Sequence, residues 1–204
     1  IPAVDRVIDS LRLGDNVVWQ VDSTDDYRAF VTPFVESALA AGRRVVYIRF
    51  EDGTPLCGQE GVKTFQLEAE CGFECFASAV NGIITAEGRG AFYVFDCLTA
   101  LLGEWCSDLM IGNFFGITCP YLYTLDTVAY FALLRGKHSF EAIARIRETT
   151  QLLIELYNIE GEIYLHPLKV WERYSPTMFL PHRPADGGYV PVTSSGEAAK
   201  LFSR

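Results

Sequence analysis

The residues Gly14-Asp-Asn-Val-Val-Trp-Gln-Val21 run directly into Asp22-Ser-Thr-Asp-Asp26, and this junction sets the expected fold. Turn residues followed by a short apolar run are typical of a buried strand. The Ser-Thr-Asp-Asp segment is typical of a helix start, because capping oxygens and negative charge both stabilise a helix N-terminus. Apolar residues recur at helical spacing over 27–39. The sequence therefore predicts a buried strand followed by an amphipathic helix.

The same alternation continues along the chain and predicts a single α/β domain. Strands joined by helices form a parallel sheet with helices on both faces, so we expect a three-layer α/β/α arrangement. Two apolar runs around Asn158-Ile-Glu-Gly161 predict an antiparallel hairpin that closes one edge. The expected strands are 17–21, 45–48, 92–95 and 128–134, the hairpin strands are 152–157 and 163–169, and the expected helices include 71–87 and one that begins at Ser139.

Two prolines interrupt apolar stretches that would otherwise be expected as continuous helices. Pro33 should kink its helix or restart it with Thr32 as the cap, since an interior proline costs about 3 kcal/mol. The stretch Leu109–Leu125 carries no charge, yet it contains Asn113 and Pro120. A buried helix, a turn near Cys119-Pro120 and a buried strand explain this stretch better than a membrane span, which needs about 20 apolar residues.

Composition excludes several classes of protein. Half of the 204 residues are hydrophobic, which is too many for a disordered chain. Lys and Arg total 17 and Asp and Glu total 26, giving a net charge of −9. Binding to nucleic acid or to an anionic membrane needs basic surface, so we expect neither partner.

The cysteines and histidines do not have the spacing of a metal site. No Cys-x-x-Cys pair occurs, and the histidines are distant from the cysteines in sequence. We therefore expect no metal and core thiols in a reducing cytoplasm. We expect His138, before the capping Ser139, to belong to a helix start. The six cysteines are Cys57, Cys71, Cys75, Cys97, Cys106 and Cys119.

Acidic residues follow three of the predicted strands. Asp22–Asp26 follow the first, Glu51 and Asp52 follow the second, and Asp96 follows the third. Ligands of parallel sheets bind beyond the carboxyl ends of the strands, so these acids should share one edge. Asp25 and Asp26 are most simply helix-capping residues. The other acids can be remnants of an ATPase, ordinary strand-end acids or a weak magnesium site, and we favour the first.

The run Phe92-Tyr-Val-Phe-Asp-Cys-Leu-Thr-Ala-Leu101 resembles the Walker B strand of the RecA superfamily, particularly that of KaiC-like ATPases. In that family the strand-end aspartate orients the magnesium shell. Tyr47-Ile-Arg-Phe-Glu-Asp52 is similar to the family's second strand, which ends in the acidic pair that activates water. Arg147–Lys169 looks like its closing segment. The resemblance covers most of residues 14–192 and implies a RecA-like fold.

The phosphate-binding loop of that family is degenerate here. Such a loop needs Gly-x-x-x-x-Gly-Lys-[Ser/Thr], because its backbone N–H groups wrap the phosphates and its Lys reaches the β/γ-phosphates. Val21 and Asp26 stand at the glycine positions, Tyr27 replaces the Lys, and Arg28 replaces the hydroxyl residue. Two like charges 4 Å apart repel by about 1–4 kcal/mol, so Asp22, Asp25 and Asp26 disfavour phosphate further.

These observations favour a non-catalytic regulatory or docking domain derived from a RecA/KaiC-like ATPase, with no cofactor. We expect its partner to be another domain of the same polypeptide or a separate protein. The runner-up is a nucleotide-binding domain or weak ATPase that holds Mg-ATP in an atypical loop, with Glu51 as base and Asp96 near Mg²⁺. A third reading, an oligomerisation module, is weakened by the loss of the nucleotide that ring-forming relatives place at each interface.

A second resemblance concerns the setting of the domain. Residues 14–21 and 42–50 look like the front part of bacterial phosphoenolpyruvate synthase-like proteins, in which a pyruvate/phosphoenolpyruvate phosphotransferase region follows. The first residue is Ile1, and the polar stretch after Val192 reads as a linker that enters another helix. We therefore expect one domain over 1–192, and the start of a linker to a further region over 193–204.

Overall fold

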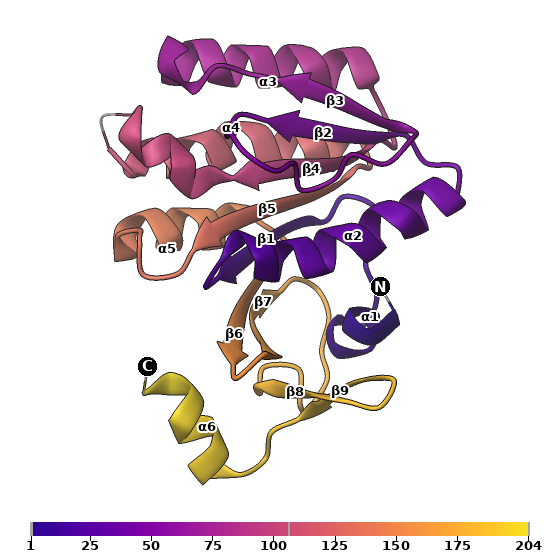
Figure 1. Cartoon of the computed structure of the whole chain (residues 1–204), viewed down its shortest axis with the longest axis vertical. Coiled ribbons are helices and arrows are strands. Elements are labelled where there is room, and N and C mark those ends of the chain that lie inside the picture. Colours follow the sequence, from indigo (N-terminus) through magenta and orange to yellow (C-terminus); the bar gives the residue numbers. More distant parts are fainter. Residues whose placement is uncertain (1, 106, 204) are drawn as a thin grey trace.

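A computed structural model of the protein describes residues 2–105 and 107–203. In these residues the strands form one nine-stranded sheet with the order β3-β2-β4-β5-β1-β6-β7-β8-β9 (Figure 1). The first six strands in this order are parallel, and the last three continue the sheet in antiparallel pairing. The strands are β1 (Asn16–Val21), β2 (Val45–Arg49), β3 (Val62–Gln66), β4 (Phe92–Cys97), β5 (Val128–Leu134), β6 (Leu152–Ile159), β7 (Glu162–Val170), β8 (His182–Ala185) and β9 (Gly188–Pro191).

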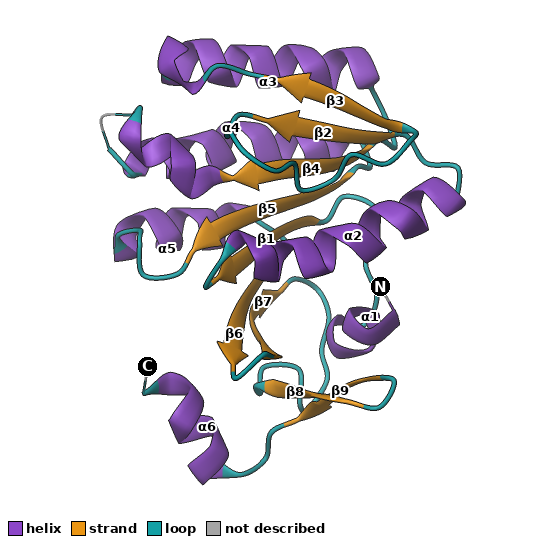
Figure 2. Cartoon of the chain, viewed as in Figure 1, coloured by secondary structure: helices purple, strands orange, loops and turns teal. Residues whose placement is uncertain are grey.

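Helices cover both faces of the parallel part, which gives three layers (Figure 2). Helix α2 packs on one face, and α3, α4 and α5 pack on the other. The predicted α/β class with a mainly parallel sheet is therefore confirmed, as are the four parallel strands predicted within it. The helices are α1 (Pro2–Ile8), α2 (Thr24–Ala40), α3 (Phe73–Glu87), α4 (Leu109–Thr124), α5 (Phe140–Thr149) and α6 (Ser195–Phe202), with 3₁₀ turns η1 (Ala69–Cys71) and η2 (Leu98–Gly103).

The alternation of side chains along each strand produces two hydrophobic cores. Val17 and Trp19 of β1 face α2, whereas Val18 faces the layer of α3 and α4. In β5, Tyr130 stacks on Phe34 of α2 with the ring centroids 3.9 Å apart. Strands buried on both faces read as continuous apolar runs, which is why the sequence located them well.

Some local expectations were wrong. Strand β3 was not predicted, because only two of its residues are even partly buried and it forms the sheet edge. The turn expected near Cys119-Pro120 is absent, since α4 continues through Pro120 to Thr124. Apolar side chains on both sides of this proline, including Phe115 and Leu122, are fully buried and stabilise the helix across it. Helix α2 likewise continues through Pro33 without a restart at Thr32.

The predicted hairpin is confirmed, and further strands extend its edge of the sheet. β6 and β7 pair in antiparallel fashion around a turn in which Glu160 and Gly161 have positive φ. β8 and β9 then form a second, shorter hairpin. Helix α6 follows, and its Phe202 ring lies 5.0 Å from the ring of His166 on β7. That residues 193–204 lead to a further region stays a prediction.

The cysteines only partly follow the expectation of core thiols. Cys57, Cys97 and Cys119 are buried, whereas Cys71, the last residue of η1, and Cys75, in the first turn of α3, are exposed. Cys106 lies outside the described residues. None of the helices in the described residues has the length and apolar character needed to cross a membrane.

Candidate functional site

The candidate site lies at the carboxyl ends of the parallel strands. From β1 the chain passes through α2 on one face toward β2, and from β5 it passes through α5 on the other face toward β6. These two connections leave neighbouring strands in opposite directions. Such a switch point opens a crevice beyond the strand ends, which is the usual ligand site of open α/β sheets.

The start of α2 satisfies one of its free backbone donors with its own cap residue. Ser23 is the N-cap residue, and its Oγ accepts a hydrogen bond from the backbone N–H of Asp26 at 3.2 Å. The same hydroxyl donates to Asp26 Oδ2 at 2.8 Å. Asp25 is exposed in the first turn, where its charge suits the helix dipole. The cap is therefore Ser23, and Asp25 and Asp26, which were predicted as capping residues, lie in the first turn of the helix. A phosphate would compete with these bonds.

An ion pair spans the crevice between β1 and β5. Asp22, directly after β1, pairs with Arg135, directly after β5, and its other oxygen accepts the backbone N–H of Asn158 at 3.1 Å. The side-chain amide of Asn158 donates to Asp26 Oδ1 at 2.6 Å. Arg135 also stacks over the ring of Tyr157 at 4.0 Å. Of the three acids that we expected to repel phosphate, Asp22 and Asp26 are thus bonded to Arg135 and Asn158, whereas Asp25 pairs with Arg28 of α2.

Tyr27, which the resemblance would place at the lysine position of a phosphate loop, points into the core. Its side chain has no exposed surface, and its hydroxyl makes no hydrogen bond with any described residue. Burial raises the pKa of this phenol well above its usual value. Arg28, at the position of the hydroxyl residue, donates to the backbone oxygen of Pro55 at 2.5 Å. Neither side chain is available to hold a phosphate.

The carboxylate of Asp96 is bonded at both oxygens. Oδ1 accepts the hydroxyl of Tyr47, while Oδ2 accepts the backbone N–H groups of Phe50 at 2.9 Å and Glu51 at 3.0 Å. Asp96 is 3% exposed, and Tyr47 in turn accepts the backbone N–H of Leu56 at 3.1 Å. The prediction that Glu51 and Asp96 share one edge is confirmed. Asp96 acts as an anchor for the loop after β2.

Glu51 and Asp52 differ in their surroundings. Glu51 is half-buried, and burial, helped by the charge of Asp96, raises the pKa of its carboxyl to about 7. Asp52 is exposed. Both line a cavity of 410 Å³ together with three further acids, namely Glu68 between β3 and η1, Glu70 in η1 and Glu104 directly after η2. The cavity surface is therefore acidic, which suits a positively charged group better than a phosphate.

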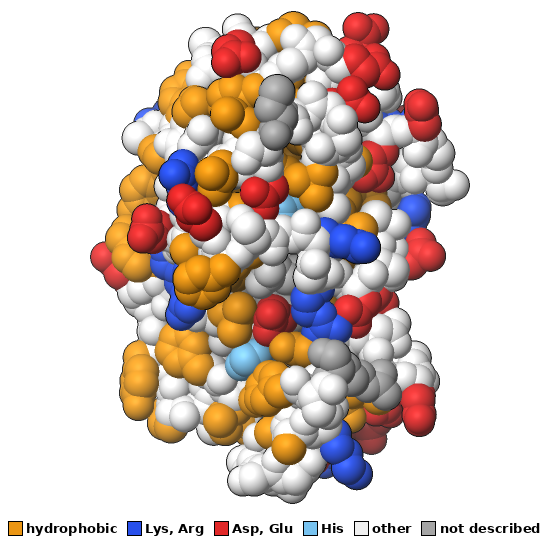
Figure 3. All heavy atoms as spheres, turned by 90° about the vertical axis from the view of Figure 1, so that its left-hand side faces the viewer, with side chains coloured by type: hydrophobic (Ala, Val, Ile, Leu, Met, Phe, Trp, Pro, Cys, Tyr) orange, Lys and Arg blue, Asp and Glu red, His pale blue; other side chains and the backbone are white. Residues whose placement is uncertain are grey.

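The face that contains the strand ends carries mixed charge. Figure 3 shows acidic, basic and hydrophobic side chains interspersed over it. In the part of the chain described by the structure, no group of three or more His, Cys, Asp or Glu side chains is arranged to hold a metal ion. His138, expected at a helix start, precedes the cap Ser139, and its Nε2 lies 2.8 Å from Thr99 Oγ1.

Sequence reasoning missed Arg135 and Asn158, which complete the site. Arg135 directly follows β5, at the same edge as the acids. Its position after an apolar run could therefore have predicted that it lies in the site. Asn158 lies at the end of the strand that pairs with β1, and that pairing was not predicted. The geometry is a strand-end crevice bridged by one ion pair, between Asp22 and Arg135, and by the hydrogen bonds of Asn158. Comparison of the sequence with protein-family models and with curated proteins found no match.

Proposed function

We propose that the protein is a non-catalytic regulatory or docking domain derived from a RecA/KaiC-like ATPase. The observation that carries this proposal is the carboxylate of Asp96, whose two oxygens accept three hydrogen bonds from Tyr47, Phe50 and Glu51. These bonds take three of the about four acceptor positions of a carboxylate, in a side chain that is only 3% exposed, so little of it is left for a metal-bound water. Here the residue ties the loop after β2 to the sheet instead.

The crevice at the switch point supports the same proposal. The Asp22–Arg135 pair lies where a phosphate would meet the start of α2, and Asn158 occupies the remaining oxygen of Asp22. A phosphate loop works through free backbone N–H groups and a lysine. In this chain the hydroxyl of Ser23 accepts the backbone N–H of Asp26. The buried side chain of Tyr27 stands where such a loop would have its lysine.

The domain then acts through its surface, by contact with other domains of the same polypeptide or with a separate protein. The resemblance of residues 14–21 and 42–50 to the front part of phosphoenolpyruvate synthase-like proteins supports a place before a phosphotransferase region. Sequencing the gene around this chain tests that placement, because a following phosphotransferase region is either encoded or not.

One observation favours the alternative, a nucleotide-binding domain or weak ATPase. The pKa of Glu51 is raised to about 7, and a carboxyl with such a pKa is suited to act as a general base at neutral pH. Its carboxyl also lines an open cavity next to Asp96. The ATPase alternative requires that Mg-ATP bind to a site that has no phosphate loop.

Thermal melting with Mg-ATP distinguishes the two functions. A nucleotide at about 100 times its dissociation constant would stabilise the fold by about 2.7 kcal/mol. For a domain of this size that corresponds to an increase in Tm of about 5–10 °C. We expect no increase with Mg-ATP beyond that seen with Mg²⁺ alone, and no phosphate release.

A matched pair of variants makes the assay specific. Glu51→Gln removes the candidate base, and Asp52→Asn removes the neighbouring exposed charge. Turnover in the unmodified protein that Glu51→Gln abolishes and Asp52→Asn leaves intact would establish the ATPase alternative. A shift in Tm without turnover would establish nucleotide binding alone and would overturn the view that the crevice is closed.

A further inference from the structure

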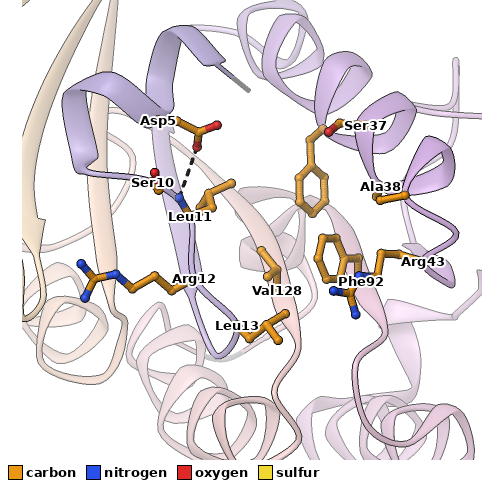
Figure 4. A pocket seen from close by; sticks show the side chains of 12 residues that line it. Asp5, Ser10, Leu11, Arg12, Leu13, Ser37, Ala38, Arg43, Phe92 and Val128 are labelled. Carbon is orange, nitrogen blue, oxygen red and sulfur yellow. Dashed lines mark hydrogen bonds between the residues drawn. The ribbon is translucent and has the colours of Figure 1, made fainter.

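A separate cavity lies at the opposite edge of the sheet, where β1, β4 and β5 begin (Figure 4). It has a volume of 340 Å³. Its walls come from the connection between α1 and β1, from the last turns of α2, and from the first residues of β4 and β5. Pockets of about 300–1,000 Å³ that combine apolar walls with a few polar groups are typical of small-molecule sites.

The floor of this cavity is apolar and partly open to solvent. Phe34 and Phe92 lie with their rings nearly parallel, at an interplanar angle of 7° and a centroid distance of 5.6 Å. Leu13, on the facing wall, is 50% exposed, and Val128 lies between the two walls in Figure 4. An exposed leucine beside an accessible aromatic ring offers surface for a flat apolar group.

A cation without a partner lies beside this floor. The guanidinium of Arg43 lies 5.6 Å from the centroid of the Phe92 ring, yet it makes no hydrogen bond or ion pair with residues 2–105 or 107–203. Arg12, which also lines the cavity, differs because it pairs with Asp9 at 3.1 Å. In a chain of net charge −9, an unpaired guanidinium beside an apolar wall is suited to an anionic ligand.

The opposite end of the cavity limits the charge of that ligand. Asp5 lines the cavity on the side of α1, across from Arg43 in Figure 4, and its Oδ1 accepts the backbone N–H of Leu11 at 3.2 Å. A second negative group on the ligand would approach this carboxylate. A single negative charge at one end of an apolar body therefore fits better than a polyphosphate.

We propose that this cavity binds a small aromatic monocarboxylic acid. Its carboxylate pairs with the guanidinium of Arg43, and its ring lies against Phe92 and Leu13. The site is remote from Asp96 and Glu51, which lie at the other ends of the same strands, so it goes beyond the proposed function and does not depend on it.

The test uses the chain as it is, with benzoate, 2-naphthoate and 2-naphthamide as probes in ¹H–¹⁵N correlation spectra. The amide is the uncharged counterpart of naphthoate. Arg43→Gln removes the unpaired cation. Arg44→Gln is its matched control, because Arg44 is the next residue, donates to the backbone oxygen of Arg89 at 2.8 Å, and does not line the cavity. Melting curves verify that both variants are folded.

We expect at least one of the two carboxylates to cause saturable shifts at the amides of Leu13, Arg43 and Phe92. Arg43→Gln should weaken binding about tenfold, and 2-naphthamide should bind about tenfold more weakly than 2-naphthoate, while Arg44→Gln changes neither. Two results would each overturn the proposal. One is the absence of saturable shifts with both carboxylates. The other is equal affinity in the Arg43→Gln and Arg44→Gln variants.

Discussion

The two ends of the parallel strands are built in opposite ways. At the carboxyl ends, Asp22 and Asp96 are bonded to groups of the chain itself, and the core beneath them is dense with buried aromatic rings. At the amino ends, a cavity of 340 Å³ remains open, and the guanidinium of Arg43 beside it makes no hydrogen bond or ion pair with the described residues. At the carboxyl ends, where α/β sheets usually bind ligands, the protein's own groups bridge the crevice between β1 and β5, and the cavity beside Glu51 is acidic. At the amino ends, the cavity has apolar walls and a guanidinium beside them.

This difference indicates which polar residues contribute to stability and which are available for binding. A buried polar group that loses its partner costs about 1–3 kcal/mol, so a substitution that removes one of these bonded partners should destabilise the fold. An exposed group without partners contributes little to the fold, and its removal should change binding alone. The following predictions use stability measurements to test this contrast.

The largest effect is expected for Asp96→Ala. The substitution leaves the backbone N–H groups of Phe50 and Glu51 and the hydroxyl of Tyr47 without their acceptor in a site that is 3% exposed. We expect the free energy of unfolding to fall by about 3–4 kcal/mol. Urea denaturation measures this change.

Asp52→Ala is the control for the loss of an acid from the same loop. Because Asp52 is exposed, its removal should change the free energy of unfolding by no more than about 0.5 kcal/mol. Similar losses in the two variants would show that Asp96 is not an anchor. That outcome would leave its carboxylate available for a ligand.

The second effect is a pH dependence that originates in Glu51. The folded-state pKa of about 7 lies above the ordinary value of 4.5, so the unfolded chain releases this proton first as the pH rises. Stability from this group is therefore present below pH 4.5 and is lost between pH 4.5 and about 7. Because the side chain is only half-buried, solvent screening limits the loss to about 1–2 kcal/mol.

Glu51→Gln removes this titration. At about pH 8 the variant should be more stable than the unmodified protein by about 1–2 kcal/mol, and this gain should disappear in acid. Asp52→Asn controls for the general effect of removing one negative charge. If Asp52→Asn produced the same gain, the effect would come from net charge and not from the burial of Glu51.

At the carboxyl ends of the strands, the sequence predicted where the acidic residues lie but did not predict the groups that bond to them. Periodicity and strand-end positions brought Asp22, Glu51 and Asp96 to one edge, since all parallel strands end on the same side. Arg135 and Asn158 follow from the order of the strands, which depends on long-range pairing of β1 with β5 and β6. A single sequence carries no local signal for that order.

The amino-end cavity could not be predicted at all. Its walls come from four segments that are distant in sequence, and Arg43 reads as an ordinary charged residue after a helix. Helix breaks were also overestimated, because α2 and α4 continue through Pro33 and Pro120. Buried apolar contacts around each proline exceed the local cost of the missing hydrogen bond.

A third prediction compares one cation from each end of the sheet. Arg135→Gln breaks the pair with Asp22 and the contact with the Tyr157 ring at 4.0 Å, so we expect the free energy of unfolding to fall by about 1 kcal/mol. Arg43→Gln, the same change at the open end, should cost no more than about 0.5 kcal/mol. Urea denaturation of both variants makes the comparison. Equal losses would contradict the contrast between the two ends.

The smallest effect is expected where the phosphate-loop lysine would be. Tyr27→Phe removes a hydroxyl that is fully buried and makes no hydrogen bond within residues 2–105 and 107–203, while it keeps the ring that fills the core. We expect the free energy of unfolding to stay constant or to rise by up to about 1 kcal/mol, because an unpaired hydroxyl is costly to bury.

Tyr47→Phe is the matched comparison, since this hydroxyl donates to Asp96 and accepts the backbone N–H of Leu56 at 3.1 Å. The same chemical change should here lower the free energy of unfolding by about 1–3 kcal/mol. A loss of that size in Tyr27→Phe as well would mean that its hydroxyl is hydrogen-bonded to a buried water. The space beneath the start of α2 would then be hydrated, and the conclusion that this crevice is closed by the protein's own groups would fail.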